Sequence, residues 1–179
     1  MKIYYNLAQL YRIVLGFIKP RVHLTDEVFA NFIVWPWLTE FWRVLQASEF
    51  TQFTDAGRWE LAVRTGYLQS LLRKRAWGVV GGQKIIYRRP IPVFSHVKVS
   101  MQIMGWENEW LYIVHRFFVK KRLHALSFVR LAIRNKNGAF QVKDLVEEKH
   151  PSNTSELPQE IRRLFESDSE LLARFESLR

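Results

Sequence analysis

The chain has 179 residues, of which 48% are hydrophobic and 15% aromatic, so it can form one folded domain and is not intrinsically disordered. It contains no cysteine, which excludes disulfides, thiolate metal sites and cysteine nucleophiles. The formal net charge is +10, and the excess of lysine and arginine lies between residues 61 and 143. Such a surface suits phosphate-bearing ligands, nucleic acid or acidic membranes, and charge alone does not choose among them.

The first predicted element is an amphipathic helix over residues 1–20, which Pro20 ends. Its apolar residues recur at helical spacing and are Leu7, Leu10, Tyr11, Val14, Phe17 and Ile18. Polar residues interrupt what would be the apolar region of a signal peptide, so secretion is not expected. We expect the apolar stripe to pack on the protein's own domain, and the alternative is a helix that lies on a membrane surface.

The next two predicted elements are a strand and a long helix. Residues Val28 to Trp37 are mostly β-branched or aromatic and predict a strand that Pro36 stops. Residues Ser48 to Arg75 contain no proline and predict the longest helix, in which Gly57 and Gly66 mark close packing or a bend.

After Gly81-Gly82 the hydrophobic pattern changes to a period of two, which predicts four strands. Their apolar positions begin at Ile85, Val97, Leu111 and Ala125. The connections between the later strands are short, so we expect an antiparallel meander.

The end of the chain predicts a linker and a second amphipathic helix. The polar stretch Lys149 to Glu156 is the linker, and the helix runs from Pro158 in its first turn to about Leu178. We therefore divide the chain into an N-terminal helix (1–20), a central domain (21–148), and a linker with a C-terminal helix (149–179).

One strand, one long helix and four antiparallel strands give an α+β fold in which only the helix is long enough to cover the sheet. This order resembles the hotdog fold, an antiparallel sheet wrapped around one long central helix, here with an amphipathic helix at each terminus. The motifs Val34-Trp35-Pro36, Glu40, Phe50, Asp55-Ala56-Gly57-Arg58, Tyr87-Arg88-Arg89-Pro90 and Gly105-Trp106 are similar to segments of hotdog acyl-CoA thioesterases of the 4-hydroxybenzoyl-CoA thioesterase type. The resemblance covers residues 21–143, and the terminal extensions resemble the thioesterase-superfamily-member branch.

The resemblance implies hydrolysis of an acyl-CoA thioester at a dimer interface. In the family, an aspartate in the loop before the central helix activates water or attacks the carbonyl, and amides at the helix N-terminus stabilise the oxyanion. Glu40 matches that aspartate, and Asp55 lies near where another hotdog subgroup keeps its acid. The structural alternative for Asp55 is an ion pair with Arg58 at i+3. Other signature positions depart from the family and carry Leu38, Val44, Gln46 and Ala47.

The resemblance also places substrate-binding residues. Gln46, Ser48 and Phe50 lie at the expected start of the central helix, beside the thioester carbonyl. The expected phosphate partners of coenzyme A are Lys84, Arg88 and Arg89, because arginine and lysine bind phosphate. An aromatic acyl pocket would include Trp37, Phe41 and Trp42.

Several other functions lack a motif. The histidines show no metal-ligand spacing, so no metal and no cofactor are expected beyond the coenzyme A of the substrate, and His115 is interpreted as a core or interface histidine. Because of the altered signature, the alternative is a hotdog protein that binds acyl-CoA or another acyl ligand without hydrolysing it. A nucleic-acid-binding module is a third hypothesis that rests on charge alone. We expect a cytoplasmic homodimer, with tetramer formation and peripheral membrane contact left open.

Overall fold

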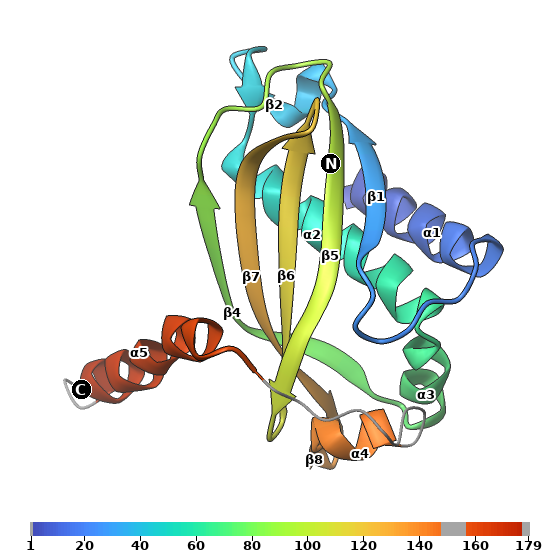
Figure 1. Cartoon of the computed structure of the whole chain (residues 1–179), viewed down its shortest axis with the longest axis vertical. Helices are drawn as coiled ribbons and strands as arrows, with labels where there is room; N and C mark the ends of the chain where they lie inside the picture. The colour runs from blue at the N-terminus through green and yellow to red at the C-terminus, as the bar shows by residue number, and fades with distance from the viewer. Residues whose placement is uncertain (1, 148–156, 177–179) are drawn as a thin grey trace.

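The computed structural model describes residues 2–147 and 157–176, and the predicted linker therefore lies outside the described residues. The fold is α+β, as predicted, with an antiparallel sheet that curls around a helix (Figure 1). The strands are β1 (Val28–Ile33), β2 (Thr39–Glu40), β3 (Val44–Leu45), β4 (Trp77–Tyr87), β5 (His96–Glu107), β6 (Trp110–Val119), β7 (Arg122–Asn135) and β8 (Gly138–Ala139). The helices are α1 (Lys2–Ile18), the short 3-10 helix η1 (Pro36–Leu38), α2 (Ala47–Arg64), α3 (Tyr67–Arg73), α4 (Val142–Glu147) and α5 (Gln159–Glu176).

The main sheet has the strand order β1-β5-β6-β7-β4, and all of its neighbouring strands are antiparallel. Strands β5, β6 and β7 form the predicted meander. Strand β4 is not part of it, because residues 88–95 cross one end of the sheet and leave β4 at the far edge beside β7 (Figure 1). This strand also begins at Trp77, before Gly81-Gly82, since the glycines lie at a β-bulge inside the strand and not at its start.

Two further boundaries differ from the prediction. Strand β1 ends at Ile33, before Pro36, because that proline begins η1 instead of ending the strand. The predicted single helix is two helices, and Gly66 separates α2 from α3 with a left-handed φ of 77°. Gly57 instead marks close packing, since a Cβ there would lie 2.2 Å from the sulfur of Met101.

The two faces of the sheet are covered by different helices. The concave face packs on α2 through a core that includes Phe50, Val99, Met101 and Phe117. The convex face is covered by the first half of α5, where Phe165 is buried against Tyr112 with ring centroids 5.8 Å apart. The second half of α5 exposes Leu171, Leu172 and Phe175, so only part of the predicted apolar stripe packs on the sheet.

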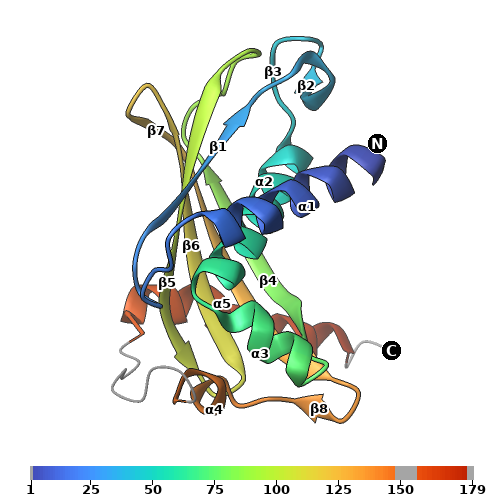
Figure 2. The ribbon, with the colours of Figure 1, turned by 90° about the vertical axis from the view of Figure 1, so that its right-hand side faces the viewer.

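Helix α1 packs on α2 in the orientation opposite to our prediction (Figure 2). Its polar side is buried, where Arg12 and Lys19 contact the fully buried carboxylate of Glu60 at 3.1 and 2.6 Å. Its apolar stripe is exposed, with 48–75% of each side chain accessible at Leu7, Leu10, Tyr11, Val14, Phe17 and Ile18. The physical reason is that an unpaired buried carboxylate is more costly than an apolar stripe left in water. Within residues 2–147 and 157–176, the structure contains no helix with the length and hydropathy of a membrane span.

Candidate functional site

Glu40 lies on a short hairpin before α2. Strands β2 and β3 pair Glu40 with Val44, and the N–H of Arg43 donates to the carbonyl oxygen of Glu40 at 3.0 Å. The turn residues Phe41 and Trp42 have left-handed φ values of 47° and 60°, which is unusual for aromatic residues. Glu40 is exposed, and its side chain makes no hydrogen bond or ion pair to any described residue.

The aromatic side chains predicted for the acyl pocket beside Glu40 lie at the surface of the chain. Phe41 and Trp42 are 90% and 73% exposed, and Trp37 stacks on Trp35 at the surface with ring centroids 5.4 Å apart. The pocket was predicted at a dimer interface, so it stays a prediction.

The start of α2 carries the next group of predicted residues. Gln46 precedes the helix, and its amide nitrogen donates to the carbonyl oxygen of Thr39 at 3.2 Å, so it ties the hairpin to the helix. Ser48 is exposed in the first turn, whereas Phe50 is buried against Tyr87 and Phe117. Phe50 thus belongs to the core and does not line an open site.

Glu49 is a residue that the sequence analysis missed. It lies in the first turn of α2, is 4% exposed, and accepts a hydrogen bond of 2.7 Å from Gln52. Burial raises its pKa above the ordinary glutamate value, and the hydrogen bond from Gln52 opposes this shift. Glu49 is a charged residue next to Phe50, and nothing in the sequence pattern indicated that it is buried.

The three predicted phosphate partners do not lie together. Arg88 and Arg89 are exposed after the end of β4, and Arg89 donates to the carbonyl oxygen of Leu123 at 3.1 Å. Lys84 points to the convex face, where its ammonium contacts Asp168 of α5 at 2.9 Å. The structure therefore separates Lys84 from the concave face.

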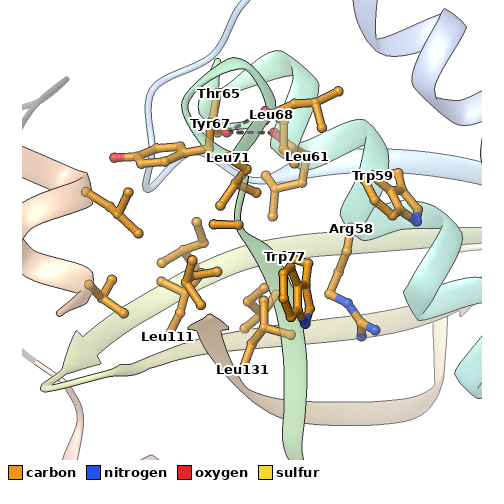
Figure 3. Close-up of a pocket in the computed structure, with 18 of the residues that line it drawn as sticks. Arg58, Trp59, Leu61, Thr65, Tyr67, Leu68, Leu71, Trp77, Leu111 and Leu131 are labelled. Carbon is orange, nitrogen blue, oxygen red and sulfur yellow. Dashed lines mark hydrogen bonds between the residues drawn. The ribbon is translucent and has the colours of Figure 1, made fainter. Parts of the chain in front are cut away.

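A cavity of about 400 Å³ lies on the concave side between α2, α3, α4 and the sheet (Figure 3). It is at the end of the sheet opposite the β2–β3 hairpin (Figure 1). Its walls are mostly apolar and include Leu61, Leu68, Leu71, Trp77, Leu111 and Leu131, all of which surround the space in the close-up. The volume is in the range of cavities that hold small ligands.

Asp55 and Arg58 are the charged residues of the cavity wall. Arg58 is paired with Asp55, and the hydroxyl of Tyr5 donates to the other carboxylate oxygen at 2.7 Å. Burial lowers the pKa of Arg58, although the neighbouring Asp55 opposes this shift. Burial and the carboxylate raise the pKa of Tyr5 to about 12, so the phenol is neutral at physiological pH. One guanidinium nitrogen of Arg58, Nη1, is buried without a hydrogen-bond partner in the described structure.

A buried polar cluster lies between α2 and the sheet. His115 of β6 is fully buried, and burial together with the positive charge of Arg58 lowers its pKa to about 3. The backbone of Ser127 opposes this lowering of the pKa only in part, so the imidazole is neutral. Neither ring nitrogen makes a well-aligned hydrogen bond to a described residue. Beside it across the sheet, Gln83 donates to Ser127 at 3.1 Å and to Thr54 of α2 at 3.3 Å.

Chemically, the cavity combines an apolar chamber with a carboxyl group and a guanidinium donor at its edge. Sequence spacing predicted the Asp55–Arg58 pair, but Tyr5 is 50 positions away and was missed. No group of three or more metal-ligating side chains occurs among residues 2–147 and 157–176.

A profile of the thioesterase-like superfamily matches residues 34–165, which is most of the chain. The chain belongs to this superfamily. The match begins before the β2–β3 hairpin and ends within α5, so it includes α2, strands β4 to β7 of the main sheet and most of the cavity lining. The curled sheet around α2 is the hotdog fold that the sequence motifs suggested.

Individual relatives are distant. Protein THEM6 of Drosophila melanogaster is 25% identical over 77 residues, which are 43% of this chain and 40% of the fly protein. The crystal structure of YbaW, a probable thioesterase from Escherichia coli, superposes with a TM-score of 0.63 and 14% identity over 68% of this chain and 94% of that one. A thioesterase from Thermus thermophilus complexed with coenzyme A and Zn has a TM-score of 0.58 and 15% identity over 70% and 96% of the two chains. At these identities the likeness shows the fold.

Proposed function

We propose that the protein hydrolyses an acyl-CoA thioester whose acyl group occupies the cavity of about 400 Å³ between α2, α3 and the sheet. The observation that carries this proposal is the carboxylate–guanidinium pair of Asp55 and Arg58 at the edge of an otherwise apolar chamber. An acyl thioester has the matching shape, with an apolar chain that ends in a polar carbonyl. The solved structures of thioesterases with the same fold, one of them with bound coenzyme A, support the same chemistry.

In the proposed reaction, Asp55 takes a proton from water, and the water oxygen bonds to the thioester carbonyl carbon. Arg58 Nη1 is positioned to donate to the resulting oxyanion, because it is buried in the cavity region without a partner. Collapse of the intermediate breaks the C–S bond, and the leaving thiolate of coenzyme A receives the proton from Asp55. The neutral phenol of Tyr5 orients the carboxylate. His115 is not the base, since its pKa of about 3 leaves it a poor proton acceptor at neutral pH.

Glu40 remains the alternative carboxylate. It matches the family's aspartate in the motif, but the hairpin holds it exposed and outside the cavity. Gln46, Ser48, Arg88 and Arg89 are proposed contacts for the coenzyme A portion. A catalytic role for Glu40 would require a second subunit to complete the site around it.

We propose a homodimer that forms through β4. This strand has 11 residues and an edge to which no strand of residues 2–147 and 157–176 pairs, and it exposes apolar side chains at Trp77, Val79, Val80, Ile86 and Tyr87. Pairing two such edges would satisfy the free backbone groups and cover these side chains. Light scattering at micromolar concentration should give the mass of a dimer, and a monomer would contradict the proposal.

The second candidate is a protein that binds acyl-CoA without hydrolysis, which the altered Val44 and Ala47 positions favour. A panel of acyl-CoA substrates of increasing chain length distinguishes the two, because only the enzyme releases free thiol. The cavity variant Ala62→Phe should shift the preferred acyl group to shorter chains, since Ala62 lines the chamber. The control Ala139→Phe adds the same ring at an exposed residue of β8 and should leave chain-length preference unchanged.

A further inference from the structure

We propose that the face formed by α1 and α3 binds the surface of an anionic phospholipid membrane. The first observation is the exposed apolar stripe of α1, whose six large side chains are 48–75% accessible. They recur at i, i+3, i+4, i+7, i+10 and i+11 from Leu7, so they form one continuous ridge along the helix. A contiguous apolar ridge of this kind is a mark of an interaction surface.

Helix α1 is held in this orientation by its polar side. Arg12 is 5% exposed and reaches Glu60, Lys19 reaches the same carboxylate, and Tyr5 reaches Asp55. Turning the stripe inward would break all three contacts and leave the buried carboxylate of Glu60 with only Arg64, at 3.8 Å. The outward stripe is therefore built into the fold.

The surroundings of the stripe are positively charged. From Tyr67 to Arg75 the sequence has three lysines and arginines and no acid, and Arg21 follows the end of α1. Helices α1 and α3 lie on the same side of the molecule (Figure 2), and residues of both line a small cleft between them. Arg21, Arg73, Lys74 and Arg75 are exposed, as is Leu72 of α3 at 68%.

The positive charge of this face favours an anionic membrane over a second copy of the chain as the binding partner. A second copy placed on the same face would bring another set of like charges against the first, which disfavours self-association there. An anionic bilayer supplies the opposite charge, while its acyl boundary accepts the apolar ridge. An amphipathic helix with apolar residues on one side and cations nearby lies in the plane of the membrane interface.

The experiment is flotation of the full chain with vesicles of phosphatidylcholine alone and of phosphatidylcholine mixed with phosphatidylglycerol. We expect binding to the anionic vesicles that weakens with added salt and is weak on the neutral ones. The double variant Leu10→Gln with Phe17→Gln removes two side chains that are 57% and 62% exposed, so the fold should be unaffected. The affinity of this variant for the anionic vesicles should fall by about tenfold or more, since two apolar side chains no longer move from water into the membrane interface.

The matched control is Leu172→Gln with Phe175→Gln on α5, where the same residue types are 61% and 66% exposed. It should bind the anionic vesicles as the unmodified protein does. Absence of binding to anionic vesicles at low salt, or equal loss in both double variants, would overturn the proposal. A lower molar mass of the α1 double variant in light scattering would also overturn it, because a second copy would then cover the stripe.

Discussion

Glu60 should be one of the most important side chains for the attachment of α1. Its carboxylate is fully buried on α2 and contacts Arg12 at 3.1 Å and Lys19 at 2.6 Å. Glu60→Gln keeps the size of the side chain but removes the charge, which leaves the guanidinium of Arg12 buried at 6% exposure without a counter-charge. Breaking a buried ion pair from one side destabilises a protein by about 3–5 kcal/mol. Lys19 is 34% exposed and recovers hydration, so it adds little.

The assay is urea or thermal unfolding followed by circular dichroism. At about 2–4 °C per kcal/mol for a domain of this size, Glu60→Gln should lower Tm by roughly 10 °C. The control Glu107→Gln removes a carboxylate that is 40% exposed and pairs with Arg162 at the surface, and it should change stability by less than about 1 kcal/mol. Equal stability of Glu60→Gln and the unmodified protein would refute the argument that charge burial orients α1.

Two other predictions concern the core. His115 has a pKa of about 3 in the fold against 6.5 ordinarily, so the unfolded chain binds the proton first and stability falls as pH drops from about 6.5 towards 3. Between pH 7 and pH 5, His115 should lower the free energy of unfolding by about 2 kcal/mol. Urea unfolding of His115→Leu at both pH values should lack this decrease, and the same pH dependence in the variant would contradict the prediction. Gly57→Ala should destabilise the fold by about 1–3 kcal/mol, because the added methyl would overlap the sulfur of Met101. Adding Met101→Val to Gly57→Ala should recover part of the lost stability. If urea unfolding shows that Gly57→Ala alone leaves stability unchanged, the close packing of Gly57 on Met101 is contradicted.

Local patterns predicted most elements, but long-range partners decided how they are oriented. The spacing of Leu7, Leu10 and Val14 predicted a helix, yet which side of it faces inward depends on Glu60, which is 48 positions from Arg12. Gly66 was predicted as one of two sites of bending or close packing, and its left-handed φ makes it the helix break. The position of β4 beside β7 was not predictable from the period-two pattern, since that pattern gives strands without their neighbours.

The candidate site could be predicted from the sequence only in part. The i, i+3 spacing of Asp55 and Arg58 indicated the ion pair that the structure contains. The sequence could not show that this pair lines a cavity, because the other walls include α3, α4 and four strands distant in the chain. The motif placed Glu40 before the central helix, where the structure also has it, but the pattern did not show that Glu40 is exposed on a hairpin with a left-handed turn at Phe41 and Trp42.

The central claim is that Asp55 at the cavity edge activates water for thioester hydrolysis. The most direct measurement is kcat for release of coenzyme A thiol by Asp55→Asn and Glu40→Gln, on the acyl-CoA that the unmodified protein hydrolyses fastest. Unfolding curves and light scattering first establish that both variants are folded and assembled as the unmodified protein is. We expect Asp55→Asn to lower kcat by about a hundredfold or more, whereas Glu40→Gln should change it by less than about threefold. Full activity in Asp55→Asn together with loss in Glu40→Gln would contradict it and move the reaction to the hairpin, and no hydrolysis of any acyl-CoA by the unmodified protein would contradict an enzymatic role.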